Sequence, residues 1–427
     1  MKSLVGSQRE RAPLKGKALA QLRQQLRECA AGTGGEVSAR NRAAKLGETY
    51  LGLDDAGRHE FLRRIALDFG PEPAKVAAAH DAYQSAVGTP RQWDAEADLR
   101  AALRSSRIRI LTQFNALPQG VKFLVDLRTD LLRFLEKDEE LAVLDRELES
   151  RLTAWFDVGF LELQRITWNA PASLLEKLIR YEAVHEIRSW NDLRNRLDSD
   201  RRLYAFFHPR MPQEPLIFVE VALTKELSSN IQELLDEHAP VFDPARADTA
   251  IFYSISNTQP GLRGVSFGNF LLKRVIDDLK RDYPQLKTFA TLSPLPQFAA
   301  WLRRTPEALE GLGLTLAQLT AGEWAQDRAA VRRLRDPLES RAARYLYAIR
   351  QNGRPDDPVA RFHLGNGARI ERINFLADTS AKGFRQSCGL MVNYLYDPEE
   401  IEQNVEAFVG EDRIAATAAI RRLAKTR

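Results

Sequence analysis

Cysteine is scarce in this sequence: only Cys29 and Cys388 occur among 427 residues. Two thiols are too few for a disulfide framework or a cysteine-rich zinc site, and such scarcity is typical of a protein from a reducing compartment. Cys29 continues the apolar stripe of Leu22 and Leu26, so we expect a buried structural thiol there. For Cys388 two roles stay open, a structural thiol and an oxidation-sensitive contact between subunits.

An excess of charge of one sign is also missing, since 62 basic and 58 acidic residues give a net charge of +4. So small a charge does not predict binding to nucleic acid. No apolar run approaches the roughly 18 residues of a membrane span, and no signal-peptide core follows the basic N-terminus. That basic start faintly resembles a transit peptide, but its leucine spacing favours a packed helix. With no peroxisomal Ser-Lys-Leu at the C-terminus, we expect a soluble cytoplasmic protein of bacterial type.

Two common phosphate-binding motifs are absent. The sequence has no Walker motif ending in Gly-Lys-Ser/Thr and no Gly-x-Gly-x-x-Gly followed about 20 residues later by an acidic residue, which weakens the nucleoside triphosphate and dinucleotide interpretations.

The length predicts two domains, because single cores stop growing at about 250 to 300 residues. From residue 14 to about 150 the apolar spacing is helical, with stripes such as Leu144, Leu148 and Leu152. We expect an α-helical scaffold or oligomerisation domain over residues 1–154, without a catalytic cluster, and a catalytic domain over residues 155–427.

A strand, a glycine-rich turn, a helix and a second strand follow one another between residues 250 and 296. The strand covers residues 250–256, and the turn 259–268 contains three glycines. Leu271, Val275 and Leu279 then mark one face of a helix, and residues 287–292 form the next strand, which leads into Ser293. Backbone N–H groups at the start of such a helix suit a phosphate, although this segment alone favours a plain strand-to-helix turn.

The remaining strands and helices of the catalytic domain are predicted from the same periodicities. A helix begins near Pro171, and residues 306–352 are helical and polar, as in a surface elaboration. Strand-like segments lie at residues 203–207, 216–223, 369–375 and 391–396.

Motifs distributed over this domain closely resemble the malonyl-CoA decarboxylase family. The resemblance runs from about Trp155 to about Pro398 and is weaker in the helical region. The motifs, in chain order, are FFHP (206–209), VEVALT (219–224), SPLP (293–296), FHLGNGA (362–368), RIN (372–374), SCGLM (387–391) and NYLY (393–396). The resemblance implies an α+β protein, in which an N-terminal all-α helical bundle precedes an α/β catalytic domain with the fold of Gcn5-related N-acetyltransferases.

In that fold an acyl-CoA lies between two splayed parallel strands, with its pyrophosphate on the turn before the helix. The resemblance places this turn at Arg263, Gly264, Val265, Ser266, Phe267, Gly268 and Asn269. The usual acetyltransferase signature, Gln/Arg-x-x-Gly-x-Gly/Ala, is present with one departure, because Ser266 replaces the central glycine. This departure leaves the phosphate contacts open.

The reaction that the resemblance implies converts malonyl-CoA to acetyl-CoA and CO2. It must stabilise an enolate oxygen and then protonate carbon 2, for which preorganised donors suffice and no metal or organic cofactor is required. Ser293, at the end of the second splayed strand, and His363 are the implied pair, with serine as acceptor and histidine as donor. Histidine ordinarily titrates near neutral pH, which suits a proton donor. On spacing alone, Ser293 reads as a turn residue and His363 as a structural histidine.

Four further residues are weighed for the same site. Tyr396, taken as the third catalytic residue, and Asn393 could orient the carboxylate or the thioester. His208 is a weaker candidate, since Pro209 suggests a structural strand end, and Glu220 points either into the sheet or into solvent.

Two other functions share the same core. One is an acyl-CoA-dependent N-acyltransferase, which needs an amine acceptor, and the other is a non-catalytic malonyl-CoA sensor. We favour the decarboxylase, with malonyl-CoA and acetyl-CoA as ligands and self-association into a dimer or tetramer.

Overall fold

The structure is a computed structural model that describes residues 14, 16–32, 35–265, 271–351 and 354–425. These residues form two compact units. The helical unit contains the chain up to Phe160 with two later segments, His208–Pro212 and the described part of Gln259–Ser266. The catalytic unit contains Leu161–Phe207, Gln213–Thr258 and the chain from Phe267. The expected boundary between residues 154 and 155 stays a prediction.

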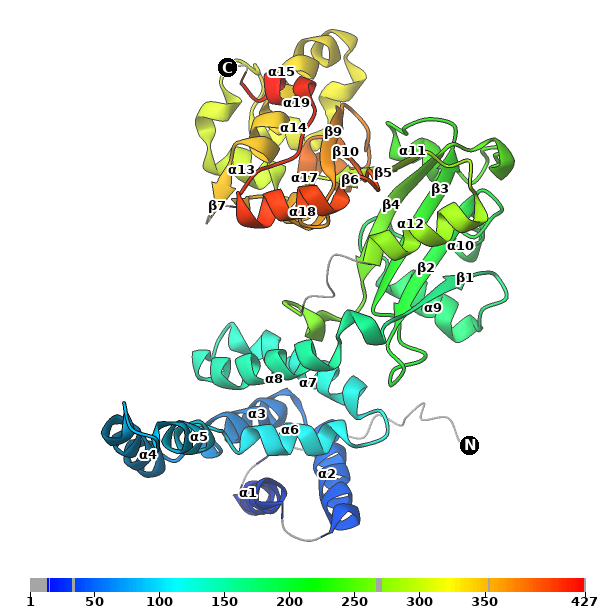
Figure 1. Cartoon of the computed structure of the whole chain (residues 1–427). Helices are drawn as coiled ribbons and strands as arrows, with labels where there is room; N and C mark the ends of the chain where they lie inside the picture. Colours follow the sequence, from blue (N-terminus) through cyan, green and yellow to red (C-terminus); the bar gives the residue numbers. More distant parts are fainter. Residues whose placement is uncertain (1–13, 15, 33–34, 266–270, 352–353, 426–427) are drawn as a thin grey trace. The chain divides into compact units, whose positions relative to one another are not determined.

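The helical unit confirms the predicted bundle (Figure 1). Its core is made by apolar stripes at helical spacing, of which Leu144, Leu148 and Leu152 are fully buried. Cys29 is also buried there, and burial raises the pKa of its thiol to about 11, as expected for a structural cysteine. Within the described residues the helices are α1 (Gly16–Ala31), α2 (Glu36–Leu51), α3 (Asp55–Asp68), α4 (Pro73–Ala86), α5 (Gln92–Ala102), α6 (Arg107–Asn115), α7 (Gly120–Leu135) and α8 (Ala142–Trp155).

The catalytic unit is built on a mixed sheet, which in the described residues has eight strands in the order β1-β2-β3-β4-β5-β10-β6, with β9 paired to β10. All pairs are antiparallel except β4 with β5, which are parallel. The strands are β1 (Glu162–Ile166), β2 (Arg201–Phe207), β3 (Ile217–Thr224), β4 (Thr249–Asn257), β5 (Thr288–Thr291), β6 (Ser293–Pro294), β9 (Arg369–Asn374) and β10 (Met391–Leu395). β1 and β6 were not predicted from the sequence.

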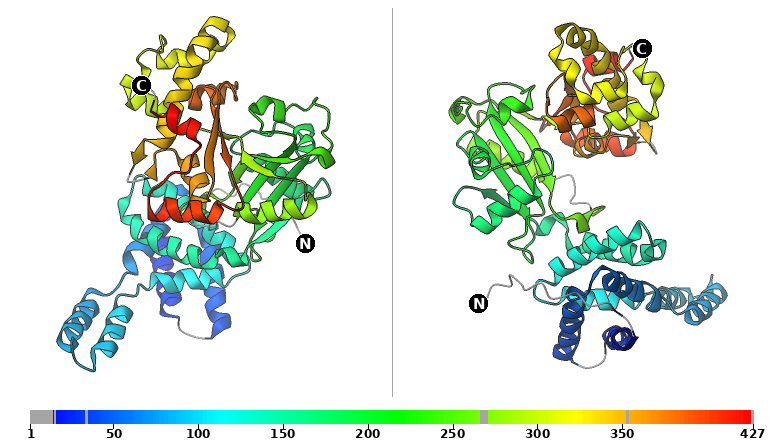
Figure 2. Two further views of the ribbon diagram at one scale, coloured as in Figure 1. Left: turned by 45° about the horizontal axis from the view of Figure 1, so that its top comes forward. Right: turned by 180° about the vertical axis from the view of Figure 1, so that it is seen from behind.

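Helices cover both faces of the first half of this sheet (Figures 1 and 2). On one face, α9 (Ala172–Tyr181) and α10 (Trp190–Asn195) pack against the odd-numbered residues of β2, such as Leu203 and Phe207. On the other face lies α12 (Leu271–Asp282), where Asp278 accepts a hydrogen bond from Tyr204 at 2.9 Å and Arg274 stacks over Phe206. Side chains alternate between the two faces of a strand, so packing on both faces buries all of β2, whose residues from Leu203 to Phe207 are apolar.

The segment from β4 through α12 to β5 is the predicted β-loop-α-β unit, since a parallel pair requires such a crossover. Leu271, Val275 and Leu279 form the buried face of α12, as their spacing predicted. Together with the helical first unit, this arrangement confirms the predicted α+β fold class. The described part of the segment 306–352, residues 306–351, is largely helical as well.

The rest of the catalytic unit surrounds β9 and β10 with helices. They are α11 (Ile231–Leu234), α13 (Phe298–Arg304), α14 (Leu316–Ala321), α15 (Arg328–Tyr347), α16 (Pro358–Gly365), α17 (Ala381–Ser387), α18 (Ile401–Gly410) and α19 (Ala418–Leu423). A small two-stranded sheet of β7 (Arg350–Gln351) and β8 (Arg354–Pro355) precedes α16. Among the described helices, none has the length and apolar character needed to cross a membrane.

Candidate active site

The two parallel strands separate after Phe252 and Thr291, the last residues that pair between β4 and β5. β4 continues to Asn257, whereas the other chain passes into β6, which pairs with β10. A cleft of about 220 Å³ opens at this divergence. The sequence predicted such a gap between splayed strands, with Ser293 at its edge, and Ser293 does line the cleft.

The wall of the cleft is mostly apolar. Phe252 and Ile255 come from β4, while Val359 and Phe362 come from α16. None of the described residues that line it is Asp, Glu, Lys or Arg. A charged group that enters the cleft therefore loses water without gaining a counter-ion from this wall.

Ser293, His363 and Tyr396 form one hydrogen-bonded chain. Ser293 Oγ lies 3.0 Å from His363 Nε2, and the Tyr396 hydroxyl lies 2.8 Å from His363 Nδ1. All three side chains are buried, yet Ser293 and His363 also line the cleft. The structure thus brings together the three residues that the sequence placed in the site. We call these three candidate catalytic residues the catalytic triplet.

The directions of these hydrogen bonds follow from their neighbours. Ser293 Oγ donates to Thr291 Oγ1 at 2.9 Å, so its remaining bond, to His363 Nε2, is one in which it accepts. Nε2 therefore carries the imidazole proton, and Nδ1 accepts from the Tyr396 hydroxyl. The protons run in one direction, from Tyr396 through His363 to Ser293.

Burial determines the protonation state of the catalytic triplet. It lowers the pKa of His363 to about 3, so the imidazole is neutral near neutral pH. Burial also raises the pKa of Tyr396 well above 10, so the phenol keeps its proton. The expectation that His363 would titrate near neutral pH is therefore wrong, because a fully buried imidazolium would have neither water nor a counter-ion. His363 can pass a proton only as a neutral ring.

Two neighbours hold His363 in place. The ring of Tyr394 stacks on the imidazole, with centroids 4.6 Å apart and planes inclined by 25°. Asp357 caps α16 by accepting hydrogen bonds from the backbone N–H groups of Val359 and Ala360. Desolvation by burial raises the pKa of Asp357 to about 6. The helix that carries His363 is thus fixed at its N-terminus.

The expected pyrophosphate turn is described only in part. Ser266, Phe267, Gly268 and Asn269 lie outside the described residues. Gly264 has a φ of +85°, in the region that glycine adopts without strain. The described half of the turn, Arg263, Gly264 and Val265, belongs to the helical unit.

Arg128 of α7 holds this half of the turn. Its guanidinium donates to the carbonyls of Gly261 and Arg263 at 3.0 and 2.6 Å and forms ion pairs with Asp145 and Glu149. Gly261 itself lies against α7, where an added Cβ would stand 1.9 Å from a backbone oxygen. Sequence reasoning missed Arg128, because an arginine on a leucine-rich helix looks like an ordinary surface residue.

The weaker candidates do not line the cleft. Asn393 is fully buried, and both ends of its amide are bonded inside the protein. His208 lies in the helical unit, with Nε2 3.0 Å from the Trp155 carbonyl and Nδ1 accepting from the N–H of Arg210. Glu220 points into the interior, where it is fully buried and paired with Arg196 at 3.0 Å. None of the three is therefore placed to contact a substrate in the cleft.

The sequence also matches models of a known family. Residues 69–156 match the malonyl-CoA decarboxylase N-terminal domain, and residues 159–427 match the malonyl-CoA decarboxylase C-terminal domain. The mitochondrial malonyl-CoA decarboxylase of Anser anser anser is 37% identical over an alignment of 417 residues, with 90% of this chain and 83% of that protein covered. The mouse protein of the same name is 37% identical over 423 residues, with 90% and 85% covered.

Comparison with solved structures also finds malonyl-CoA decarboxylases. The malonyl-CoA decarboxylase of Rhodopseudomonas palustris superimposes with a TM-score of 0.88 at 43% identity, covering 96% of this chain and 100% of that one. For the protein of the same name from Agrobacterium vitis the TM-score is 0.87 at 43% identity, with 95% and 100% covered. This chain therefore belongs to the malonyl-CoA decarboxylase family.

Proposed function

We propose that this enzyme converts malonyl-CoA to acetyl-CoA and CO2 through an enolate that Ser293, His363 and Tyr396 stabilise and protonate. The observation that carries the proposal is an uncharged chain of hydrogen bonds, 3.0 and 2.8 Å long, at the wall of an apolar cleft. Family membership supports the overall reaction, and this geometry supports the division of roles.

The apolar wall favours the loss of CO2. A malonyl carboxylate placed there has little solvation to lose on becoming neutral CO2. When the C–C bond breaks, its electron pair moves into the thioester carbonyl and forms an enolate oxygen. The negative charge thus moves from the carboxylate to the enolate oxygen, where a hydrogen-bond donor can stabilise it.

Ser293 is that donor in our proposal, because its hydroxyl lines the cleft. The hydroxyl rotates from Thr291 toward the enolate oxygen and then relays a proton to carbon 2. His363 Nε2–H replaces the serine proton, and Tyr396 gives its own proton to Nδ1. A proton from solvent then restores the Tyr396 hydroxyl, and this is the one proton that the overall reaction consumes. A thioester enolate is basic enough to take a proton from neutral donors, so the low pKa of His363 does not prevent the transfer. Overall, malonyl-CoA and one proton give acetyl-CoA and CO2.

The remaining parts of the proposal come from the family resemblance and the chemistry. The pyrophosphate of CoA would lie on the Arg263–Asn269 turn. The reaction requires no metal or organic cofactor, since the thioester itself accepts the electrons. Self-association into a dimer or tetramer, and a cytoplasmic location, stay predictions.

The first experiment is to incubate the purified, metal-stripped protein with malonyl-CoA and no acceptor. We expect acetyl-CoA and CO2 in equal amounts, measured by chromatography and by release of labelled CO2. Intact malonyl-CoA, with its binding confirmed by calorimetry, would contradict the proposal. Turnover that begins only when an amine is added would indicate the N-acyltransferase, and continued inactivity would indicate the sensor.

A further inference from the structure

The hydrogen-bond ladder beside Ser293 contains one irregular step. β10 pairs with β5 and with β6 in the same register, since Leu395 faces Ala290 and Val392 faces Ser293. Between these pairs, β5 ends at Thr291 and β6 begins at Ser293. The same place on β10 carries a register shift toward β9, between Asn393 and Tyr394. Such bulges are frequent beside active sites, where they redirect side chains.

Side chains replace main-chain bonds at this step. The N–H of Tyr394 donates to Thr291 Oγ1 at 3.2 Å, and the Thr291 carbonyl accepts from Asn393 Nδ2 at 2.7 Å. Both Thr291 and Asn393 are fully buried. A buried carbonyl left unpaired costs about 1 to 3 kcal/mol, so the Asn393 amide is needed where the ladder is interrupted.

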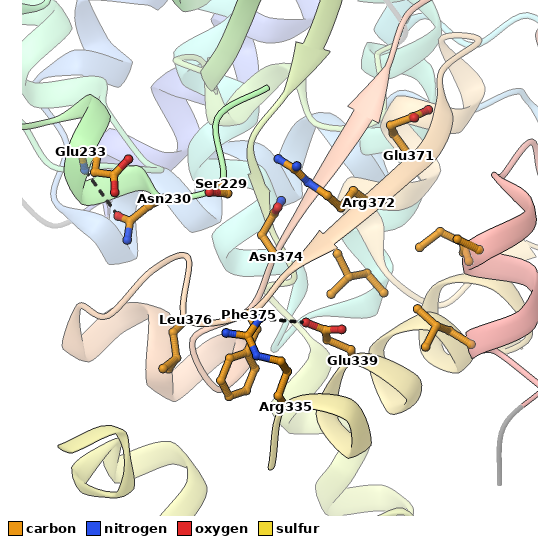
Figure 3. A pocket seen from close by; sticks show the side chains of 14 residues that line it. Ser229, Asn230, Glu233, Arg335, Glu339, Glu371, Arg372, Asn374, Phe375 and Leu376 are labelled. Carbon is orange, nitrogen blue, oxygen red and sulfur yellow. Dashed lines mark hydrogen bonds and ion pairs between the residues drawn. The ribbon is translucent and has the colours of Figure 1, made fainter. Parts of the chain in front are cut away.

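The orientation of the Asn393 amide is fixed by its partners. Its Oδ1 accepts from Arg372 Nε at 3.1 Å and from Asn374 Nδ2 at 2.9 Å, and an arginine can only donate. Its Nδ2 faces the carbonyls of Thr291 and Ser228, which can only accept. Figure 3 shows Arg372 and Asn374 on β9, where they also line a pocket of about 510 Å³.

The Thr291 hydroxyl in turn orients Ser293. Thr291 Oγ1 accepts the proton of Ser293 Oγ at 2.9 Å, which leaves a serine lone pair for His363 Nε2 at 3.0 Å. Without this acceptor, the serine proton could turn toward Nε2, and the imidazole would then carry its proton on Nδ1. Tyr396 would have to reverse its own bond as well.

We propose that Thr291 and Asn393 are positioning residues, which together set the proton direction of the catalytic triplet. Asn393 fixes the backbone at the strand break, and Thr291 fixes the serine hydroxyl. Neither lines the cleft within the described residues, so each acts through Ser293. The kinetic part of this proposal rests on the proposed function, whereas the hydrogen-bond directions do not.

The kinetic test compares Thr291→Val, which removes the hydroxyl at nearly constant shape, with Thr291→Ser, which keeps it. We expect Thr291→Val to lower kcat about 10-fold with KM little changed, since one hydrogen bond to the serine is lost. Thr291→Ser should restore kcat. Asn393→Asp, which sets a carboxylate oxygen against two carbonyls, should lower kcat at least as much. Thr249→Val, a buried threonine at the opposite end of the β4–β5 pair, is the matched control and should leave kcat unchanged.

A double-mutant cycle separates positioning from a merely structural role. If Thr291 acts through Ser293, adding Thr291→Val to Ser293→Ala should cause no further loss of kcat. Independent losses that multiply would overturn the proposal. So would a Thr291→Val enzyme with full kcat and a lowered Tm.

A spectroscopic readout needs no turnover. Nitrogen-15 NMR of histidine-labelled protein, with His363 assigned through His363→Gln, should show the Nε2–H tautomer in the unmodified protein and in Thr291→Ser. In Thr291→Val we expect a shift toward Nδ1–H. An unchanged tautomer would overturn the proposal even in an active enzyme, and a shifted tautomer would support it even if malonyl-CoA proved not to be the substrate.

Discussion

Two polar clusters of the catalytic unit are buried away from water, and they differ in how they compensate for that loss of water. The catalytic triplet contains no charge at neutral pH, because burial keeps His363 and Tyr396 neutral. In the second cluster, which we call the ion cluster, Arg196 pairs with Asp192 at 2.8 Å and with Glu220 at 3.0 Å. All of these side chains are nearly or fully buried.

This difference in charge suits the two clusters to different roles. In the ion cluster one arginine faces two carboxyl groups, and burial raises the pKa of Glu220 to about 8. Near neutral pH Glu220 is therefore largely protonated, and the charge of Arg196 is balanced by Asp192. Such pairing fixes β3 to α10 but leaves no capacity for a further charge. The triplet keeps no counter-ion, so the charge that enters its cleft can be that of the substrate. In the proposed mechanism, neutral donors would meet the developing enolate without an existing ion pair to compete for them.

The largest expected effect is on stability, from breaking the ion cluster. Arg196→Met leaves Asp192 and Glu220 without their buried partner, so we expect the free energy of unfolding to fall by roughly 3 to 5 kcal/mol. Denaturant unfolding followed by tryptophan fluorescence measures the change. Combining it with Glu220→Leu should recover part of the loss, because an apolar replacement removes one buried carboxyl group that has lost its partner. A fully stable single variant would show that the ion cluster does not stabilise the fold.

The next effect is on turnover, from breaking the triplet. Ser293→Ala and His363→Ala should each lower kcat by about 10²-fold or more, because each removes a donor used only in the transition state. CoA affinity, measured by calorimetry, should change little. Wild-type turnover in either variant would remove that residue from the mechanism.

A smaller effect concerns the pH dependence of stability. The folded-state pKa of His363 is about 3, below the ordinary value of 6.5. Between these two pH values, the imidazole binds a proton in the unfolded chain but not in the folded chain. Stability present above pH 6.5 is therefore lost as the pH falls toward 3. Between pH 7.5 and pH 5 this loss is about 2 kcal/mol.

His363→Gln should abolish that part of the acid sensitivity, as measured by denaturant unfolding at the two pH values. His80→Gln, on the exposed surface of α4, is the control and should leave the acid sensitivity as it is. Equal acid sensitivity in the unmodified protein and in His363→Gln would mean that His363 is already charged in the folded state.

The smallest effect is expected at Cys388. This thiol is fully buried, and desolvation raises its pKa to about 12, so little thiolate forms near neutral pH. Mild oxidant should leave activity and oligomeric state unchanged, as measured by turnover and by light scattering. If oxidant changed the activity or the oligomeric state of the unmodified protein but not of Cys388→Ala, the redox role that the sequence left open would be supported.

Sequence reasoning reached the fold class and the members of the triplet, but by different routes. The strands and helices around Leu203, Leu271 and Leu279 follow from periodicity, which is a local property of the chain. The pairing of Ser293 with His363 came from family motifs, because no spacing rule brings together residues 70 positions apart.

The missed residues share one property: their role depends on a neighbour in space. Thr291 looks like any strand threonine, and the importance of its hydroxyl depends on a break in the ladder that the sequence does not show. The pKa of His363 depends on burial by Tyr394 and the surrounding chain, so the ordinary value for histidine was the wrong guide. The order of the family motifs along the chain did not indicate that Arg128 holds the turn before α12.

The division of the chain into units has a consequence for protein engineering. The helical unit includes His208–Pro212 and part of Gln259–Ser266, which lie within the catalytic part of the sequence. Neither unit is therefore one contiguous stretch of the chain. A fragment that starts at Leu161 would carry both segments without the helices that hold them, and would expose Gly261 and its neighbours to water. Chimaeras made by joining the halves of two relatives at a single crossover point would mismatch the same contacts. The unit that must be exchanged in recombination therefore contains α6, whose Asn115 accepts from Arg210, with α7 and α8 and these two distant segments.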